Sequence, residues 1–499
     1  MSRRNSAPLV GLALDPSAAE PLHRQLYDQL RHKVLSGNLA AGSRLPSSRA
    51  LARELGCARN TVLSAFDQLT AEGYLEACQG SGSFVTSVLP EELLGLSSAP
   101  ARQGERAQRM PKLSERGRAL TAARRDARSP GVAFTVGMPD LEAFPFELWA
   151  RLLGRAWRVP AAELLRHGDP AGYPPLRQAI ADYLNAVRGL GCRAEQILIT
   201  SGSQQAVDLV ARILLDPGEG VWLEDPGYTG LRGPLVAAGL KVCPVPVDDD
   251  GFDLAAARAG SDATRLAIVT PSHQYPLGRV LSLQRRLALL DWAYEQDGWI
   301  LEDDYDSEYR YAGRPLAALT GLDRSRRDGG GRVIYLGSFS KVLFPALRLA
   351  YLVIPEPLVE AVISARRALD DHPSMVVQPA LARFISEGHF ASHVRRMRVL
   401  YAARQQALLA AAERHLADLL DLRPDEAGMH LVARPTPLLA ARMDDREATA
   451  RAAATGLTVS PLSSYYLGEA KQQGLLLGYA AVPEAEMERA VARLATALA

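Results

Sequence analysis

The stretch Leu301-Glu-Asp-Asp-Tyr-Asp-Ser-Glu-Tyr-Arg310 places several carboxylates and a phenol directly after the apolar run Gly298-Trp-Ile-Leu301. A second short apolar run, Arg332-Val-Ile-Tyr-Leu336, leads into Gly337-Ser-Phe-Ser-Lys341, where one lysine stands among serines. Short apolar runs that end in polar groups predict buried strands of an α/β sheet, with a site at the carboxyl ends of the strands.

The two runs together offer the groups that pyridoxal phosphate (PLP) requires. A carboxylate can keep a pyridinium nitrogen protonated, a phenol can hydrogen-bond a phenolate oxygen, and a lysine can form a Schiff base. The acidic run alone could equally be a solvated loop, and the serine-lysine run alone an ordinary turn. Their occurrence together, each after a predicted strand, favours a PLP site.

Length and composition limit the class of protein. A chain of 499 residues with 47% hydrophobic and 23% charged residues is expected to hold several domains, or one large domain with an appendage. The formal net charge of +1 requires any nucleic-acid site to be local. The scattered cysteines argue against a disulfide framework and a structural zinc site; they are Cys57, Cys78, Cys192 and Cys243. No apolar run approaches the ~20 residues of a membrane span, and the basic N-terminus leads to no signal-like core, so we expect a soluble, cytoplasmic protein without a metal.

The N-terminal part predicts a helix-turn-helix. Residues 21–39 carry leucine and valine at spacings of three and four, which is one apolar face of a helix. Ser47 is a good N-cap for a second helix over Ser48–Leu55, which Gly56 ends. A third helix is expected from about Ala58 to Glu72. The second and third helices, joined by a short turn, form the helix-turn-helix.

A β-hairpin is expected after these helices. Tyr74–Cys78 and Phe84–Thr86 read as strands around the glycine-rich turn Gln79–Ser83, the wing of a winged helix. The last helix of such a unit enters the major groove of double-stranded DNA by its N-terminal residues. The expected DNA contacts are Arg44, Ser47, Arg49, Arg59, Asn60, Thr61, Gly80 and Gly82. A small helical domain with ordinary surface arginines is the alternative.

These residues resemble the winged-helix domain of the GntR superfamily. The resemblance is carried by Arg44-Leu-Pro-Ser-Ser-Arg-Ala-Leu-Ala-Arg-Glu-Leu-Gly56, Glu72-Gly-Tyr-Leu75 and Gly80-Ser-Gly-Ser-Phe-Val85. It implies a DNA-binding domain over residues 15–87. Seven Lys/Arg face six Asp/Glu over residues 20–87, so dimerisation and specific contacts must add to the affinity for DNA.

Residues 88–130 differ in composition and predict a basic linker. They hold nine Lys/Arg against five acids and show little apolar periodicity. The segment is either a solvated linker or a tether whose arginines contact DNA phosphates or the following domain.

From Gly131 onward, apolar strands and helices alternate, which predicts a doubly wound parallel sheet. The strand Ile197–Thr200 leads into Ser201-Gly-Ser-Gln-Gln205, a turn whose backbone N–H groups could cradle an anion at a helix N-terminus. The strands Val221–Glu224 and Leu266–Val269 also end in polar segments. Several strand ends are therefore expected to meet at one polar edge.

The order of these segments resembles fold-type I aminotransferases over residues 131–499, with a small C-terminal subdomain at about 370–499. With the winged helix, the whole chain resembles the MocR subfamily of GntR regulators. By this resemblance Lys341 matches the Schiff-base lysine, Asp303 the partner of the pyridine nitrogen and Tyr305 the partner of the cofactor's O3′.

The same resemblance implies further cofactor contacts. They are Tyr228, which stacks on the ring, the phosphate ligands Ser203, Gln204, Ser338 and Arg348, and the loop residues His273 and Gln274 at the cofactor's edge. Asp304 and Asp306 are more simply explained as solvated or structural acids. Fold-type I sites commonly borrow residues from a second subunit, so the resemblance also implies a homodimer, head-to-tail in this subfamily.

The chain departs from the aminotransferase pattern where substrate binds. The arginine that usually holds the substrate carboxylate aligns with Leu476, which cannot form paired N–H···O bonds. Tyr275 stands where many aminotransferases have Asn, and His167 where relatives often have Tyr. Arg434 or Arg232 could replace the missing arginine.

Two functions remain open. One is a DNA-binding regulator that senses PLP itself, with vitamin B6 synthesis as a candidate target, or an amino acid or amine that reacts with PLP. The other is an active aminotransferase with an appended DNA-binding domain. The complete DNA-binding unit and Leu476 favour the regulator, with at most residual aminotransferase chemistry. A third reading makes the second domain a dimerisation scaffold, without PLP.

Overall fold

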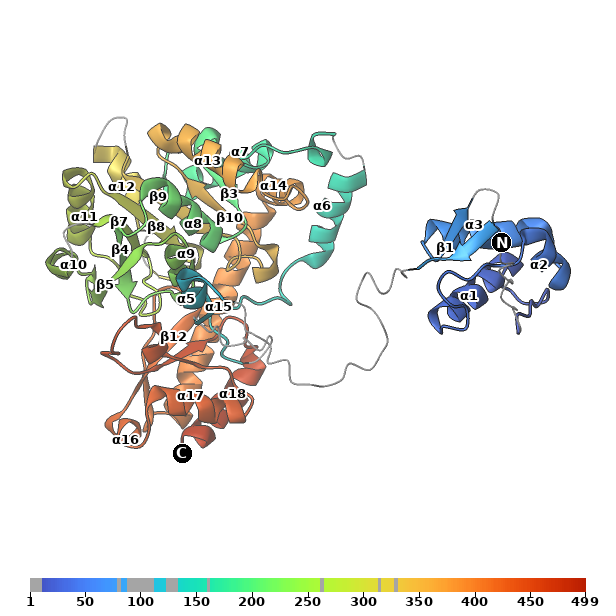
Figure 1. The fold of residues 1–499 in the computed structure, drawn as a ribbon. Helices are drawn as coiled ribbons and strands as arrows, with labels where there is room; N and C mark the ends of the chain where they lie inside the picture. Colours follow the sequence, from blue (N-terminus) through green and yellow to red (C-terminus); the bar gives the residue numbers. More distant parts are fainter. Residues whose placement is uncertain are drawn as a thin grey trace. The chain divides into compact units, whose positions relative to one another are not determined.

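The computed structural model describes residues 11–78, 82–87, 112–122, 133–158, 162–260, 264–312, 316–326 and 331–499. The chain divides into two compact units, Met1–Pro111 and Lys112–Ala499 (Figure 1). Within the described ranges, every helix is too short or too polar to cross a lipid bilayer.

The N-terminal unit is a winged helix, as predicted. Its elements are α1 (Leu22–Leu35), α2 (Ser48–Glu54), α3 (Arg59–Ala71), β1 (Leu75–Cys78) and β2 (Gly82–Val85). The helices bury their apolar faces in one cluster, and β1 pairs with β2 in antiparallel register. This arrangement gives α3 and the β1–β2 hairpin the positions of a recognition helix and a wing.

The local signals that start and end these helices act as expected. The Ser47 hydroxyl accepts a hydrogen bond from the Ala50 N–H at 3.2 Å and so caps α2. Gly56 follows α2 with φ +63°, and Gly73 follows α3 with φ +83°. A side chain at either position would strain the turn, which explains why both helices end at glycine.

The large part of the C-terminal unit is built on an eight-stranded sheet with the order β3-β10-β9-β8-β7-β4-β5-β6. The strands are β3 (Ile197–Thr200), β4 (Gly220–Asp225), β5 (Lys241–Asp248), β6 (Gly251–Phe252), β7 (Thr264–Val269), β8 (Trp299–Asp304), β9 (Val333–Ser338) and β10 (Ala350–Val353). Strands β5, β4, β7, β8 and β9 run parallel in succession.

The doubly wound parallel sheet expected from the sequence carries antiparallel strands at both ends. Strand β10 is antiparallel to both β3 and β9, and β6 is antiparallel to β5. The connection from β9 to β10 over residues 339–349 contains only a short 3-10 turn, and a chain this short without a crossover helix cannot return parallel. Since β10 reverses between them, β3 and β9 run in the same direction, so the expected strand ends do share one edge.

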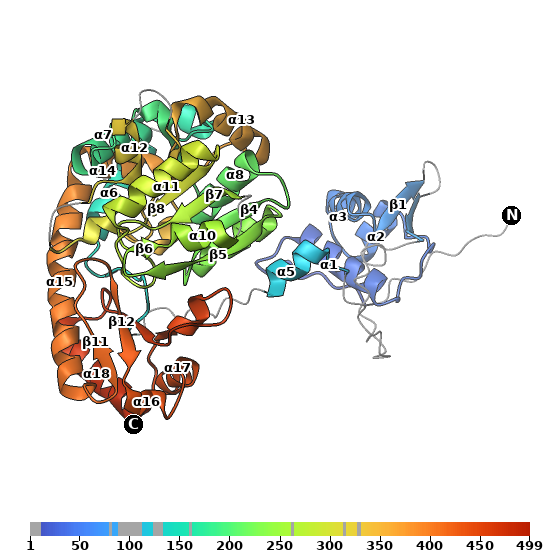
Figure 2. The same ribbon diagram turned by 90° about the vertical axis from the view of Figure 1, so that its left-hand side faces the viewer.

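Helices cover both faces of this sheet (Figure 2). They are α6 (Phe146–Arg158), α7 (Pro174–Arg188), α8 (Ser203–Leu214), α9 (Arg232–Ala237), α10 (Leu254–Gly260), α11 (Leu283–Glu295), α12 (Leu319–Arg326), α13 (Val359–Asp370) and α14 (Gln378–Ser386). Alternate residues of a strand enter different cores: Ile197 and Ile199 of β3 pack in one apolar cluster and Leu198 in another. Helix α14 packs on α6 and α7, so the large part extends beyond residue 370.

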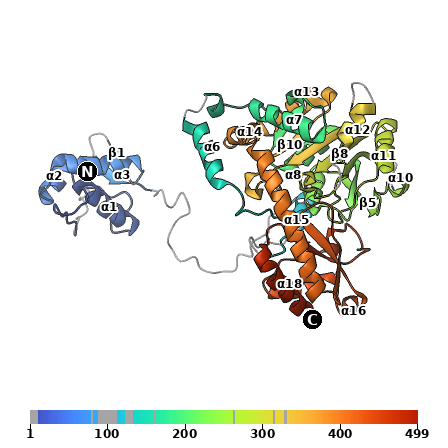
Figure 3. The same ribbon diagram turned by 180° about the vertical axis from the view of Figure 1, so that it is seen from behind.

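The small C-terminal subdomain is an antiparallel sheet with the order β11-β12-β14-β13. Its strands are β11 (Leu420–Leu422), β12 (His430–Pro435), β13 (Ser460–Pro461) and β14 (Leu475–Gly478), and its helices are α16 (Pro437–Ala440), α17 (Asp445–Ala454) and α18 (Glu484–Leu498). The long helix α15 (His389–His415) contacts α14 at one end and packs along α18, so it joins the two parts (Figure 3).

The segment predicted as a linker is described only over residues 112–122; residues 88–111 and 123–130 lie outside the described ranges. The described piece contains α5 (Glu115–Ala122), which packs against α9 of the C-terminal unit. The Arg116 guanidinium lies close to Gly239, just after α9. This piece of the segment is therefore helical and belongs to the C-terminal unit.

Candidate functional site

The carboxylates of the acidic run at the end of β8 alternate between the two sides of the sheet. Glu302 and Asp304 lie on one side and Asp303 on the other. Glu302 accepts backbone N–H groups at the start of α12. Asp304 forms a buried ion pair with Arg188 at 2.7 Å and accepts the Tyr335 hydroxyl at 2.6 Å. Both acids are held by the surrounding protein, which identifies them as structural carboxylates.

Asp303 differs from its two neighbours because its Oδ1 is buried and has no hydrogen-bond partner among the described residues. Burial, and next the charges of Asp304, Glu224 and Asp306, raise the pKa of Asp303 to about 7, against an opposing effect of Lys341. A buried carboxylate oxygen without a donor is costly. A ligand N–H with positive charge, such as a pyridinium, would supply what this oxygen lacks.

Lys341 follows β9 and reaches the same region. Its Nζ donates a hydrogen bond to the Gly137 carbonyl at 3.0 Å. Gly137 has φ +68°, and a Cβ built there would come within 2.5 Å of Nζ. The ammonium group therefore lies against bare backbone, and it is near enough to Asp303 to affect that carboxyl's pKa.

An anion cradle lies at the start of α8. The helix begins after Gly202, which has φ +114° and offers no side-chain cap. The Arg348 guanidinium packs over this glycine, since a Cβ there would be 3.0 Å from Nη2. Ser203 lies in the first turn, where N–H groups have no intrahelical acceptor. A helix N-terminus beside a guanidinium is suited to a phosphate.

Two other predicted phosphate ligands already have partners inside the protein. The Gln204 Nε2 donates to the Gly230 carbonyl at 2.8 Å, and the Gln204 backbone lies in the first turn of α8. The Ser338 hydroxyl, at the end of β9, accepts the Ser340 N–H at 3.2 Å.

Three tyrosines form an aromatic chain at this edge. The Tyr228 and Tyr275 ring centroids are 5.8 Å apart, and those of Tyr275 and Tyr305 are 5.7 Å apart, both edge to face. Tyr228 also lies against Gly230, where a Cβ would overlap its ring. Burial, with the neighbouring charge of Asp306, raises the pKa of Tyr305 well above its ordinary value, so the phenol keeps its proton.

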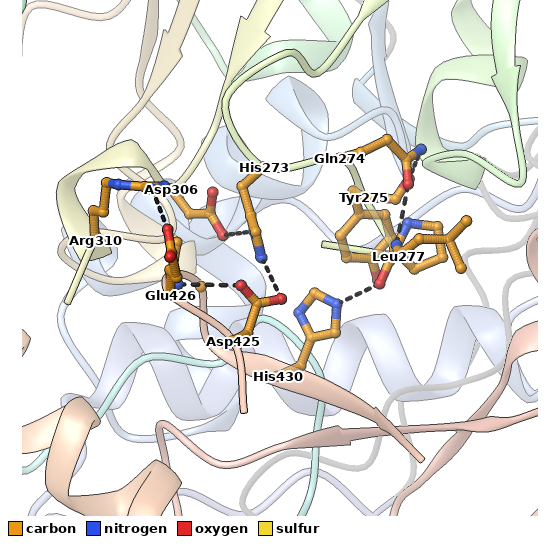
Figure 4. A network of polar contacts seen from close by, with 12 residues as sticks. His273, Gln274, Tyr275, Leu277, Asp306, Arg310, Asp425, Glu426 and His430 are labelled. Carbon is orange, nitrogen blue, oxygen red and sulfur yellow. Dashed lines mark hydrogen bonds and ion pairs between the residues drawn. The ribbon is translucent and has the colours of Figure 1, made fainter. Parts of the chain in front are cut away.

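The loop that contains His273 and Gln274 hydrogen-bonds to neighbouring segments at this edge of the sheet (Figure 4). The Gln274 Nε2 donates to the Pro226 carbonyl at 2.9 Å and to Glu224 at 3.2 Å. Burial raises the pKa of Glu224 to about 7, although it accepts hydrogen bonds from Thr270. Sequence reasoning missed Glu224 because it reads as the last residue of an ordinary strand.

Sequence reasoning also missed the partners of His273. Its Nδ1 lies 2.9 Å from Asp306, and its Nε2 lies 3.3 Å from Asp425 (Figure 4). The same Nδ1 lies 3.0 Å from the Tyr305 hydroxyl. Asp425 comes from the small subdomain, before β12. No pattern in the sequence marks an acid so far along the chain as part of this site.

Leu476, at the position of the usual carboxylate-binding arginine, lies in an apolar cluster against which Tyr275 packs. Leu476 is fully buried in a cluster with Val136, Leu462, Tyr465 and Tyr466, so this position offers no cation. Both arginines proposed as replacements lie near this cluster, Arg232 at Tyr465 and Arg434 at Tyr466.

The two replacement arginines are engaged or exposed. Arg232 donates from Nη2 to the Tyr465 carbonyl at 2.6 Å, and Arg434 is exposed on β12, opposite Asp421. His167 has a side chain that is 90% exposed, with Nδ1 2.7 Å from Asp371.

The predicted DNA contacts cluster around α2, α3 and the wing. Arg44, Arg49, Arg59 and Asn60 are exposed. The Arg59 Nε donates to the Ser48 hydroxyl at 3.3 Å, which links α3 to α2. The remaining positions are the cap residue Ser47, the half-buried Thr61, Gly82 beside the Arg44 guanidinium, and Gly80, which lies outside the described residues.

Two family models match the chain, one for each unit. The model "Bacterial regulatory proteins, gntR family" matches residues 22–85, and "Aminotransferase class I and II" matches residues 147–494. A DNA-binding winged helix followed by an aminotransferase-type domain defines a class of bacterial transcriptional regulators.

Curated relatives match over nearly the whole length. The chain is 44% identical to the probable rhizopine catabolism regulatory protein MocR of Rhizobium meliloti, covering 97% of this chain and 95% of the relative. It is 32% identical to the pyridoxine biosynthesis regulator PdxR of Corynebacterium glutamicum, covering 98% of each. It is 33% identical to the regulator TauR of Rhodobacter capsulatus, covering 98% and 99%. The chain belongs to this MocR family of transcriptional regulators.

Solved structures match the C-terminal unit. The α-aminoadipate aminotransferase LysN of Thermus thermophilus, complexed with N-(5′-phosphopyridoxyl)-L-leucine, is 30% identical with a TM-score of 0.66, covering 77% of this chain and 94% of that one. The kynurenine aminotransferase of Pyrococcus horikoshii is 26% identical with the same TM-score, covering 80% and 97%. The predicted fold-type I aminotransferase domain is thereby confirmed.

Proposed function

We propose that this regulator binds PLP in its C-terminal unit and that occupancy of this site changes the binding of its winged helix to operator DNA. The observation that carries the proposal is the orphaned Oδ1 of Asp303, buried beside Lys341 at the end of β8. A DNA-binding protein of this family acts in the bacterial cytoplasm.

The residues present fit PLP. Asp303 would accept the pyridinium N–H, Tyr305 would donate its hydroxyl proton to the phenolate oxygen, and Tyr228 would stack on the ring. Arg348 and the N–H groups at Ser203 and Gln204 would hold the phosphate, with Ser338 beside them. When bound, PLP supplies an aldehyde that the Lys341 amine can attack, and this amine also competes with other amines for it.

The signal is PLP itself or an amino acid or amine that reacts with PLP. The apolar cluster around Leu476 supports a ligand that needs no carboxylate clamp at this position, which favours PLP itself or a simple amine. The relatives' names include regulators of pyridoxine biosynthesis and of rhizopine catabolism, so they support both kinds of signal.

Coupling to DNA requires two states of different affinity. Ligand binding must favour one arrangement of the C-terminal unit, and the segment over residues 88–130 must carry that change to the winged helix. We infer a homodimer, head-to-tail, because paired winged helices would contact two half-sites and a second subunit would complete each PLP site.

The decisive experiment measures DNA binding and PLP binding on the same full-length chain. DNA from upstream of the chain's own gene would be footprinted with and without PLP and with and without candidate amines. We expect a visible absorbance band of bound PLP that disappears in Lys341→Ala, and a change in operator affinity on PLP addition. Identical footprints under all conditions would refute the sensing proposal.

An active aminotransferase is the competing function, because the solved structures that match are aminotransferases. Transamination of common amino donors at ordinary enzyme rates, ~1–10³ s⁻¹, would favour it. We expect turnover far below that range, because Leu476 provides no partner for a substrate carboxylate.

A further inference from the structure

His273 lies between a carboxylate of the large part and a carboxylate of the small subdomain (Figure 4). Its Nδ1 is 2.9 Å from Asp306 Oδ2, and its Nε2 is 3.3 Å from Asp425 Oδ2. The same Nδ1 is 3.0 Å from the hydroxyl of Tyr305. One imidazole therefore contacts the phenol of the proposed cofactor site and both parts of the C-terminal unit.

The imidazole is held in its charged form. Burial alone would lower the pKa of His273, but the charges and hydrogen bonds of Asp306 and Asp425 outweigh burial and raise the pKa to about 10. A second buried histidine, His430, has its ring centroid 6.0 Å away. Burial and the nearby His273 lower the pKa of His430 to about 4, so it stays neutral and donates from Nε2 to the Pro276 carbonyl at 2.9 Å.

Two glycines allow the loops to close around this imidazole. Gly278 has φ +72°, and a Cβ there would overlap the Asp425 carboxylate. Gly428 has φ +92°, and a Cβ there would overlap the His273 ring. Any other residue would be strained by both its φ and the contact, so the backbones of both parts set the position of the ring.

The segment around Asp425 also docks on the segment that contains Tyr305. The Tyr311 N–H donates to the Glu426 carbonyl at 2.7 Å, and the Gly428 N–H donates to the Tyr309 carbonyl at 3.0 Å. Arg310 and Glu426 form an ion pair beside these bonds (Figure 4). Movement of the small subdomain would therefore disturb the segment that contains Tyr305, which contacts His273.

Other charged groups face His273 from a neighbouring cavity of about 130 Å³. Those that line it with His273 are Arg188, Glu308, Arg310 and Arg398. Arg188 and Arg310 already pair with Asp304 and Glu426. The carboxylates in direct contact with the imidazole are thus Asp306 and Asp425.

We propose that His273 is a positioning residue that couples Tyr305 to the small subdomain. This inference rests on the proposed PLP site. Clamped between Asp306 and Asp425, the imidazole holds the Tyr305 phenol in place for the cofactor's phenolate oxygen. When the small subdomain withdraws Asp425, the imidazole loses one of its two anchors and the phenol is no longer fixed. The position of the small subdomain and the contact with the cofactor therefore depend on each other.

The first test follows the visible spectrum of PLP bound to the full-length chain as pH changes. Removing a donor to the phenolate oxygen makes the bound cofactor hold its proton more tightly, so Tyr305→Phe raises the spectral midpoint. We expect Asp425→Asn to raise it by a smaller amount, and the double variant to match Tyr305→Phe alone. A role of Asp425 in stability only would leave the midpoint unchanged, and additive shifts in the double variant would overturn the coupling.

Glu488→Gln is the matched control. It removes an exposed carboxylate of the same subdomain that pairs with Arg414 and His415, away from His273. We expect this variant to keep the wild-type midpoint.

The second test needs no PLP. Hydrogen exchange of residues 305–311 in the apo full-length chain should be faster in Asp425→Asn and His273→Asn than in wild type and Glu488→Gln. Equal exchange rates in all four proteins would contradict the proposed clamp, whether or not the chain binds PLP. If the wild-type chain binds no PLP, the proposed function fails, while this second test still decides whether the clamp exists.

Discussion

The guanidinium of Arg348 packs directly over Gly202, the residue before α8, so closely that a Cβ on Gly202 would lie 3.0 Å from Nη2. Both residues have positive φ, +114° for Gly202 and +51° for Arg348. Two uncommon backbone conformations therefore meet at one helix N-terminus. Strained backbone conformations of this kind cluster at active sites and ligand clamps.

Gly202→Ala should weaken PLP binding, because the new methyl group strains the backbone at φ +114° and displaces the guanidinium. We expect a cost of about 1–3 kcal/mol, measured by titrating PLP and following absorbance. Gly233→Ala is the matched control. Gly233 lies in α9, and no atom lies within 4 Å of a Cβ built there, so the variant should bind PLP with wild-type affinity. Equal effects of the two variants would contradict the cradle.

Asp303→Asn and Asp304→Asn should behave in opposite ways although the residues are adjacent. Asp304→Asn breaks the buried ion pair with Arg188 and should destabilise the C-terminal unit by about 3–5 kcal/mol. Asp303→Asn removes a carboxylate without a partner for its Oδ1, so apo stability should hold or rise while affinity for PLP falls. Thermal unfolding of the apo protein and a PLP titration check both.

The His273 clamp predicts a pH dependence of stability. Its folded pKa of about 10 lies above the ordinary value of about 6.5, so its contribution is complete below pH 6.5 and is lost as pH rises toward 10. The pKa of Asp425 is lowered by its bond to His273, against the effect of burial, so its contribution is lost only in acid. The apo thermal midpoint should fall less between pH 6.5 and 10 in His273→Asn than in wild type. Parallel pH curves would contradict this.

Leu476→Ala should lower the stability of the C-terminal unit by about 2–5 kcal/mol, because it leaves a cavity in a closed apolar cluster. Leu476→Arg should cost more, since it buries a charge without a partner. Thermal melts of the two variants measure the order of the effects. An Arg variant as stable as wild type would show that the position opens to solvent.

Arg59→Ala should relax the choice of operator by about 1–3 kcal/mol if Arg59 reads a base edge. Arg24→Ala removes an equal charge from α1, where Arg24 pairs with Asp28, and should leave discrimination between operators unchanged. Competition binding with mutated half-sites measures both variants. A uniform loss of affinity for all DNA in Arg59→Ala would instead assign this arginine to a phosphate.

The sequence alone predicted the winged helix, because its signals are local. The apolar spacing of α1, the cap at Ser47 and the glycines after α2 and α3 act within a few residues. It also predicted that the runs with Asp303 and Lys341 lie at the carboxyl ends of two buried strands, since short apolar runs with polar ends mark the edge of an α/β sheet.

Only the tertiary structure determined which acid at the end of β8 is structural and which faces the proposed cofactor site. Adjacent strand residues point to opposite faces, so Asp304 meets Arg188 while Asp303 faces the site with an unpaired oxygen. It also reversed β10, because the short connection from β9 leaves no room for a crossover. The clamp on His273 joins residues 273, 306 and 425, which only the docking of the small subdomain brings together. Local spacing carries no information about contacts between segments that far apart, because burial and charge at such a junction depend on the packing of the whole unit.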